Sequence, residues 1–557
     1  MVSSDTATVT EHTDAIPPKT MRNRLFSLSA MALAVAAFPV YALDPASPGD
    51  YTGLSITPRI GLGETYTTNV ALAPDSQAMP GWITQITPGV TIKDSTSRTR
   101  FVVDYSFQDM IYDNYGMAHQ YFNQLNANGT AELVKQNLYI DAGATISQQP
   151  MLPIGPVSAN AANLTGNVAN ITTESVSPYW VHQFGTEATS VMRYTRIDSN
   201  YGYAGPSPVG GSQPYAQQYL QSAYSFSSQA NIIDALIKNG SDFGRVEWTL
   251  EYNDAITSYT GYPSATLAML TASVNYILTP DFKLTSQFGY EKDNYAYLGE
   301  PPQSTLWSTG FEWAPSPRTK LTASVGERFF GRTYTLDFNH RSRMTVWDAS
   351  YNQTVQTAIM QQTVPPQSAL DSILAGQIPD PAARQQAIQQ IMSAMGAQSS
   401  LFGLNVITNE VYLSKIFQAS TGITFHRDAA MLTVFNNRTI PLQQPPQPGV
   451  PGAIDSLLSQ GGYLAYGEMD QVGSTLTFTH QVSKQTLASM SASASRFNFP
   501  GQSFQETSTY MQAGLTRQLG RKTSGSLTLR HQMMNSMGSG GYSFVESAAI
   551  ASILMIF

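Results

Sequence analysis

The chain has 557 residues, of which 42% are hydrophobic, 12% charged and 11% aromatic, and none is cysteine. Soluble domains carry about 25% charged residues, so this composition is unusual for a soluble protein, and its many aromatics exclude intrinsic disorder. The lack of cysteine excludes disulfides, zinc–thiolate sites and iron–sulfur clusters, and the net charge of −8 argues against nucleic acid as a partner.

The first 42 residues have the pattern of a secretory signal. Arg22 and Arg24 precede an apolar run over 25–38, and small residues at Val40 and Ala42 predict cleavage between Ala42 and Leu43. The alternative, a membrane helix, needs about 20 apolar residues, more than this run supplies. We therefore expect 1–42 to be an N-terminal extension with a cleaved signal peptide, and 43–557 to be the mature domain.

The mature chain alternates apolar and polar residues with a period of two. In 243–253 and 281–291, for example, aromatic and aliphatic side chains occupy one face, and charged or hydroxyl side chains occupy the other. Alternation over eight or more residues predicts β-strands. The expected strands are 54–69, 82–93, 100–113, 119–133, 137–148, 171–182, 187–199, 215–229, 243–256, 264–278, 281–296, 304–314, 318–329, 332–340, 343–357, 406–425, 430–440, 466–481, 485–499, 505–518, 523–536 and 544–557.

Strand length and connection length identify the fold class. The strands are long enough to cross a bilayer when tilted, which takes about 9–11 residues, whereas globular strands average about five or six. About 22 strands (range 20–24) fit an even-numbered barrel, with short periplasmic turns and long outer loops at 149–170, 200–214, 358–405 and 441–465. The prediction is an all-β, single, up-and-down transmembrane β-barrel in the outer membrane of a Gram-negative bacterium. One connection, 230–242, is longer than expected for its periplasmic side.

The carboxyl end supports the same fold. Phe557 ends an alternating segment whose apolar positions are Ala549, Ala551, Ile553 and Met555. A terminal aromatic on such a strand resembles the signal that the barrel assembly machinery reads. That machinery and the lipid bilayer are therefore expected partners.

Several segments resemble the PEP-CTERM-system-associated outer-membrane barrel family of Gram-negative bacteria. The resemblance covers about 51–557 and is carried by Glu64–Pro74, Ile83–Val90, Ser175–Gly185, Trp313–Leu321, Gly326–Tyr351 and Ile378–Ile388. Members are encoded near exopolysaccharide-synthesis and exosortase genes, and the family's molecular activity is unassigned. The resemblance therefore implies a setting in exopolysaccharide export and supplies no catalytic residues.

Catalytic patterns are weak. A barrel phospholipase places His and Ser two apart on one strand, and His340 and Ser342 have this spacing, but they fall in an expected periplasmic turn. His182, His340, His426 and His480 lie near short turns rather than on the outer rim that an omptin-like protease uses. No spacing typical of a metal site appears. We expect no enzyme activity, no metal and no cofactor.

The lumen and one loop are the candidate functional regions. A barrel of about 22 strands is too wide for side chains to fill, so it encloses water or a plug. The charged residues expected to face this lumen are Asp104, Arg193, Arg245, Glu247, Glu251, Lys283, Glu291 and Arg328. In loop 358–405, residues 366–375 and 380–396 suit short helices, which either plug the lumen or pack on the outer face. No amino-terminal plug domain is expected, which disfavours an energised siderophore-type transporter.

The sequence thus leaves three functions open. The first is a porin-like passage or scaffold for exopolysaccharide export or surface assembly, with export proteins or the polysaccharide as partners. The second is a non-conducting structural barrel whose outer loops bind matrix polymer or surface proteins. The third, and weakest, is an outer-membrane hydrolase.

Overall fold

The structure is a computed structural model that describes 53–113, 118–150, 155–157, 162–165, 167–203, 226–260, 262–295, 302–357, 359, 411–442, 468–500, 504–537 and 543–557. The signal peptide expected over 1–42, with its cleavage site at Ala42 and Leu43, lies outside these residues. So do the short helices expected in 366–375 and 380–396. No helix of the described residues is long and apolar enough to cross a membrane.

The described chain forms one antiparallel sheet of 22 strands that closes on itself. The strands are β1 Ser55–Thr67, β2 Gly81–Ser95, β3 Thr99–Tyr112, β4 Ala118–Val134, β5 Leu138–Gln149, β6 Ala169–Phe184, β7 Ala188–Tyr203, β8 Phe226–Asn239, β9 Val246–Tyr259, β10 Tyr262–Thr279, β11 Phe282–Asn294, β12 Gln303–Ser316, β13 Thr319–Arg328, β14 Gly331–Arg341, β15 Thr345–Gln356, β16 Tyr412–Thr424, β17 Asp428–Pro441, β18 Met469–Ser483, β19 Thr486–Asn498, β20 Gln505–Gly520, β21 Thr523–Met537 and β22 Phe544–Ile556. Short 3-10 turns occupy Asp75–Gln77 and Ser241–Phe243.

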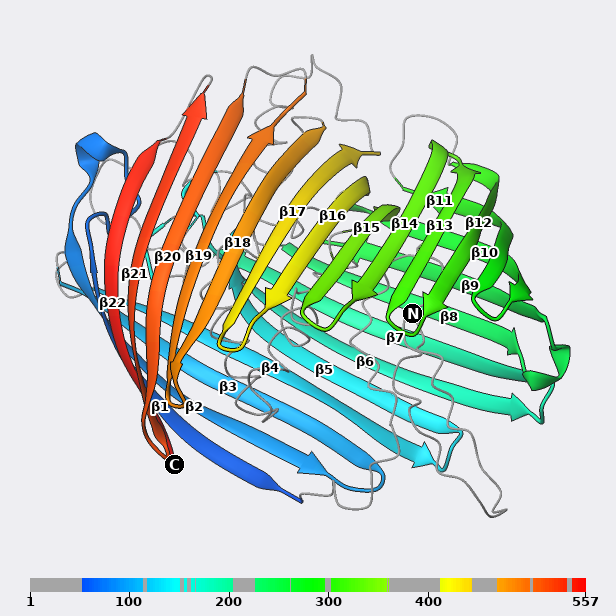
Figure 1. Cartoon of the computed structure of the whole chain (residues 1–557), viewed down its shortest axis with the longest axis horizontal. Helices are drawn as coiled ribbons and strands as arrows, with labels where there is room; N and C mark the ends of the chain where they lie inside the picture. The colour runs from blue at the N-terminus through cyan, green and yellow to red at the C-terminus, as the bar shows by residue number, and fades with distance from the viewer. Residues whose placement is uncertain are drawn as a thin grey trace.

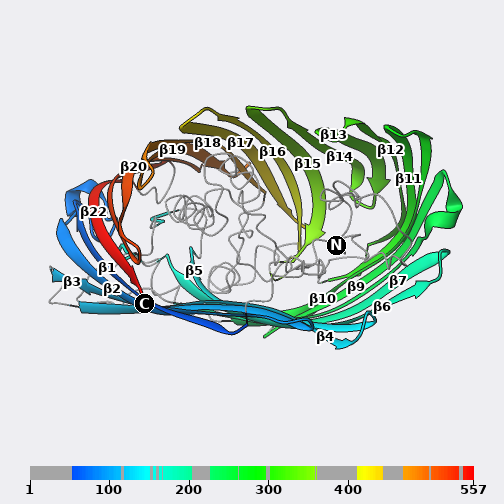
Figure 2. The same cartoon turned by 60° about the horizontal axis from the view of Figure 1, so that its bottom comes forward.

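Each strand pairs with the next along the chain, and β1 pairs with β22 from Arg59↔Ile556 to Thr67↔Ala548, which closes the barrel. The predicted fold class is therefore confirmed. The barrel is flattened: β1–β10 form one long wall, and most of β12–β22 form the other (Figures 1 and 2). Because the sheet closes, the backbone N–H and C=O groups along both edges of every strand have hydrogen-bond partners, which the apolar bilayer interior requires.

The connections confirm the expected alternation and remove its one exception. Those after even-numbered strands have two to six residues, and every long connection follows an odd-numbered strand. The expected 13-residue connection at 230–242 is wrong, because β8 spans Phe226–Asn239 and the turn is 240–245. The period of two is obscured in β8 because Ile232 faces inward and is fully buried, whereas the adjacent Ile233 faces outward.

The outer face of the barrel is apolar. Large side chains that alternate with polar ones along the strands stay exposed, as Leu270, Val274 and Phe288 do. Trp82 and Tyr121 lie near one rim, while Trp180 and Trp347 lie toward the other, which matches the aromatic girdles of membrane barrels. Exposed apolar area of this extent needs a lipid partner. The short turns therefore face the periplasm, and the long connections face outward.

The inward face changes character along the barrel axis. Inward side chains in the extracellular half are buried, as Thr67, Ile83, Tyr112 and Glu546 are. Inward side chains in the periplasmic half, such as Lys283, are partly exposed. Among the described residues, the inward face is therefore closely packed at the extracellular end and accessible to water at the periplasmic end.

Candidate functional site in the barrel lumen

Most of the charged side chains expected in the lumen lie on the inward face. Seven occupy strand positions that alternate with the outward apolar residues, namely Asp104, Arg193, Glu247, Glu251, Lys283, Glu291 and Arg328. Arg245 instead ends the periplasmic turn 240–245. Among the described residues, six of the seven form ion pairs and Glu251 forms none. Most of the charges predicted to face the lumen are therefore neutralised by a neighbouring charge.

The first of these pairs joins β1 to β3 across β2. Arg59 Nη2 lies 2.6 Å from Asp104 Oδ1, and Thr91 Oγ1 donates to Asp104 Oδ2 at 2.6 Å. The guanidinium passes directly over Gly89, where an added Cβ would lie 3.0 Å from Arg59 Cζ and 2.8 Å from Tyr105 O. Glycine is therefore required at this point of β2 because the arginine side chain occupies the space above it.

A side chain at Gly89 is expected to displace this bridge. Gly89→Val should destabilise the barrel by about 1–3 kcal/mol, because the new methyls force Arg59 away from Asp104. The measurement is urea unfolding in lipid vesicles followed by tryptophan fluorescence. Gly61→Ala on β1 is the matched control, since its Cβ would meet Thr87 Cβ at an ordinary 3.4 Å. Equal losses in the two variants would contradict this account.

Two further bridges also cross an intervening strand. Arg193 on β7 reaches Asp141 on β5 at 2.8 Å, and its guanidinium lies 4.1 Å from the ring centre of Tyr179 on β6. Lys283 on β11 reaches Glu247 on β9 at 2.9 Å. Each long cation thus covers the strand between its partners, so the bridges tie alternate strands together.

The Arg328–Glu291 pair crosses β12 in the same way near the extracellular rim. Arg328 Nη2 lies 2.5 Å from Glu291 Oε2, and both side chains are almost fully buried. The same carboxylate accepts the backbone N–H of Phe329 at 3.1 Å, which fixes the tight turn between β13 and β14. This pair therefore anchors a turn and is shielded from any solute in the lumen.

The connection between β5 and β6 docks against strands on both sides of the β1–β22 closure. Its described residues, Gly155–Val157 and 162–165, contact β3, β20–β22 and the residues that follow β1. Tyr112 Oη donates to Ala162 O at 2.9 Å, Leu164 N donates to Val70 O at 2.9 Å, and Gly155 N donates to Glu506 Oε2 at 3.0 Å. Ala162 also packs with Val70, Ile83, Met110 and Phe122 in one apolar cluster. We call the described residues 155–157 and 162–165 the docked segment.

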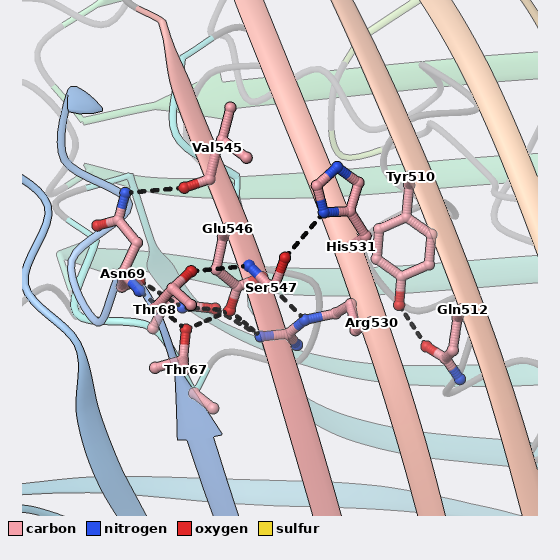
Figure 3. A network of polar contacts seen from close by, with 12 residues as sticks. Thr67, Thr68, Asn69, Tyr510, Gln512, Arg530, His531, Val545, Glu546 and Ser547 are labelled. Atoms are coloured by element: carbon pink, nitrogen blue, oxygen red, sulfur yellow. Dashed lines mark hydrogen bonds and ion pairs between the residues drawn. The ribbon is translucent and has the colours of Figure 1, made fainter.

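The docked segment meets the barrel at the buried ion pair of Arg530 and Glu546. Figure 3 shows this pair with Thr67 beside it. Arg530 Nη2 lies 2.6 Å from Glu546 Oε1, with the two side chains 1% and 0% exposed. Thr67 Oγ1 donates to the same carboxylate at 2.7 Å, and Asn163 Nδ2 donates to it at 3.3 Å. Asn163 Oδ1 accepts from Arg530 at 3.3 Å, so this amide satisfies both members of the pair. A buried charge pair is stable only when its remaining hydrogen bonds are made.

Like the docked segment, an apolar cluster between the two long walls closes part of the lumen. Ile197, Ala230, Ile232, Ala255, Leu267 and Met269 of β7–β10 belong to one buried cluster with Val355, Ile359, Val411 and Leu413, which lie in or beside β15 and β16. Thr257 Oγ1 of β9 lies 3.5 Å from Thr357 Oγ1 just after β15. We call this cluster the seam. It joins strands that lie far apart around the barrel (Figure 2).

The chain is similar to solved structures of siderophore and iron receptors at low sequence identity. No family model and no curated protein matches the chain. Among solved structures, the siderophore receptor PirA from Pseudomonas aeruginosa shares 9% identity at a TM-score of 0.40, covering 90% of this chain and 80% of that one. The FrpB iron transporter from Neisseria meningitidis (F5-1 variant) shares 9% at 0.40, over 91% and 83%. The PirA receptor from Acinetobacter baumannii shares 7% at 0.46, over 90% and 80%.

The protein is an integral outer-membrane β-barrel. Its closed even-stranded sheet, its apolar outer face and its alternating connections are the features of this class. Ala549, Ala551, Ile553, Met555 and Phe557 lie on the outward face at the end of β22, and Phe557 N donates to Pro58 O at 2.9 Å. Their role as an assembly signal stays a prediction.

The His340 and Ser342 side chains have separate partners. His340 Nδ1 lies 2.8 Å from Thr319 Oγ1, while Ser342 Oγ lies 2.7 Å from Thr345 Oγ1 and caps the periplasmic turn. The described residues contain no group of three or more potential metal ligands. Sequence reasoning missed Arg59, Arg530, Glu546 and Asn163, although inward-facing charges on alternating strands could have identified the first three.

Proposed function

We propose that this barrel is a gated passage in exopolysaccharide export, as the resemblance to barrels encoded beside polysaccharide-synthesis genes suggests. The observation that supports it best is the inner wall, where hydroxyls, amides and neutralised charges face a periplasmic half open to water. Such a wall hydrogen-bonds a neutral or weakly charged polyhydroxyl chain without holding it by a net field. Export proteins on the periplasmic side and the barrel assembly machinery are the proposed partners.

The packed extracellular half supports gating rather than a permanently open pore. The docked segment and the seam both lie at this end, and both bury side chains that would face water in an open channel. The same packing also favours a second candidate, a non-conducting structural barrel whose outer loops bind matrix polymer. The two candidates differ in whether the packing ever opens.

Conductance of the purified chain in planar bilayers separates the two candidates. The wild-type barrel is expected to show low steady conductance with brief openings. Exchanging 155–165 for a Gly–Ser linker of equal length should increase the open fraction severalfold, because the strands stay unchanged while the docked contacts are lost. A Gly–Ser exchange of the short extracellular connection 260–261 is the control and should change nothing.

Polymer secretion tests the export proposal itself. A strain that lacks this chain should secrete less exopolysaccharide, and the wild-type gene should restore secretion. Unchanged secretion would remove export from consideration. A barrel that stays silent in bilayers with and without the docked segment would favour the structural candidate.

A further inference from the structure

The two ends of the barrel differ in charge. The periplasmic turns contain nine basic and three acidic residues, and the extracellular connections contain one basic and eight acidic residues. The basic ones in the turns are Arg98, Lys135, Arg245, Arg318, Arg343, Arg427, Lys484, Arg521 and Lys522, and the acidic ones are Glu187, Asp242 and Asp281. A chain of net charge −8 thus concentrates its cations at one end.

The basic and acidic residues of the periplasmic turns lie on different sides of the barrel. The three acidic residues all lie in consecutive turns between β6 and β11. The five turns from β12 to β21, under one long wall of the flattened barrel, carry only basic residues (Figures 1 and 2). We call their six cations, Arg318, Arg343, Arg427, Lys484, Arg521 and Lys522, the basic arc.

The cations of the basic arc are exposed, and among the described residues none of them forms an ion pair. The carboxylate of Asp428, the residue after Arg427, lies 2.6 Å from His480 Nδ1 and forms no ion pair with Arg427 among the described residues. Six exposed cations without an ion-pair partner create a field that attracts anions to this side of the rim.

The neighbours of these cations place them at the membrane surface. Met344 follows Arg343, Phe425 lies two residues before Arg427, and Leu519 lies two before Arg521, and each of these apolar side chains is exposed. Phe425 is 50% exposed and Leu519 is 58% exposed. Exposed apolar side chains beside cations are the pattern of residues that insert at the lipid boundary while the charge reaches the headgroups.

We propose that the basic arc binds anionic phospholipid headgroups of the periplasmic leaflet, which would give the barrel one lipid-selective wall. Each exposed cation at a bilayer surface changes affinity for an anionic lipid by about fivefold. A soluble polyanion fits less well, because it would not account for the exposed apolar side chain in or next to each of three turns. The acidic turns between β6 and β11 should repel the same lipids, so binding is expected to be weakest on that side of the barrel.

Spin-labelled lipids test this proposal in the reconstituted full chain. The immobilised fraction of phosphatidylglycerol is compared with that of phosphatidylcholine at low and high salt. The wild-type barrel should prefer phosphatidylglycerol severalfold, and salt should weaken this preference. The triple variant Arg343→Gln, Arg427→Gln, Arg521→Gln should lose most of this preference, because half of the six cations are removed, and the corresponding Arg→Lys triple should retain it.

A matched triple variant controls for net charge. Lys292, Arg332 and Arg496 are exposed on the outward face toward the extracellular end, and their replacement by Gln removes the same charge. This control should leave the preference unchanged, because acidic residues dominate that end. An equal loss in both triples overturns the proposal. So does a periplasmic triple that keeps the lipid preference but no longer binds polygalacturonate, since the partner would then be a soluble polyanion.

Discussion

Glu546→Gln is expected to destabilise the barrel by about 3–5 kcal/mol, because it leaves the fully buried guanidinium of Arg530 without its counterion. The substitution keeps the shape of the side chain, so the loss measures charge rather than packing. Thr67 and Asn163 would also lose their charged acceptor. The measurement is the urea-unfolding free energy in lipid vesicles, with protease sensitivity of the docked segment as a second readout.

Two controls isolate the charge effect. Asp198→Asn removes a carboxylate from the partly exposed Arg196–Asp198 pair and should cost less than about 1 kcal/mol. The double variant Arg530→Met, Glu546→Leu removes both buried charges and should recover much of the stability. If Glu546→Gln unfolds with the wild-type midpoint, the ion pair does not hold this end of the barrel.

The second large effect is expected at the seam. Ile232 is fully buried between the long walls, so Ile232→Asp places an unpaired carboxylate in an apolar cluster, which costs several kcal/mol. Water must then enter to solvate the charge, and the walls should separate at the seam. We expect conductance in planar bilayers to rise at least tenfold, with the folded barrel verified by its heat-modifiable migration on gels.

Ile277→Asp on β10 is the matched control for the seam. Ile277 also faces inward, but it lies in the partly exposed periplasmic half, where water already reaches the wall. This variant should fold and conduct as the wild type does. A silent but folded Ile232→Asp barrel would show that the seam does not close the lumen, and the closure would then be assigned to the docked segment alone.

The two closures act at the same end of the barrel by different physics. The docked segment is held by directional hydrogen bonds at a buried charge pair and by the small apolar cluster around Ala162, whereas the seam is held mainly by apolar area. Polar contacts can be exchanged for contacts to a polar solute, but an apolar contact opens only against the hydrophobic effect. The docked segment is therefore the more readily released of the two.

Local sequence determined the membrane barrel. Alternation with a period of two places apolar residues outward wherever the inner face is polar, and the connection lengths assign each end of a strand to one side of the membrane. Both signals are read within a few residues, so the strand number and orientation follow without tertiary information. The signal peptide, the family and its exopolysaccharide setting stay predictions.

The side-chain contacts within the barrel lumen were decided only by the tertiary structure. Alternation failed at β8 because Ile232 packs against the opposite wall, so both faces of that strand are apolar there. The partners of Arg59, Arg193 and Arg328 are separated from them by an entire strand, and Asn163 meets Glu546 across 383 residues of sequence. Such contacts depend on how the closed sheet is flattened and where a loop docks, and these are properties of the whole barrel rather than of any one strand.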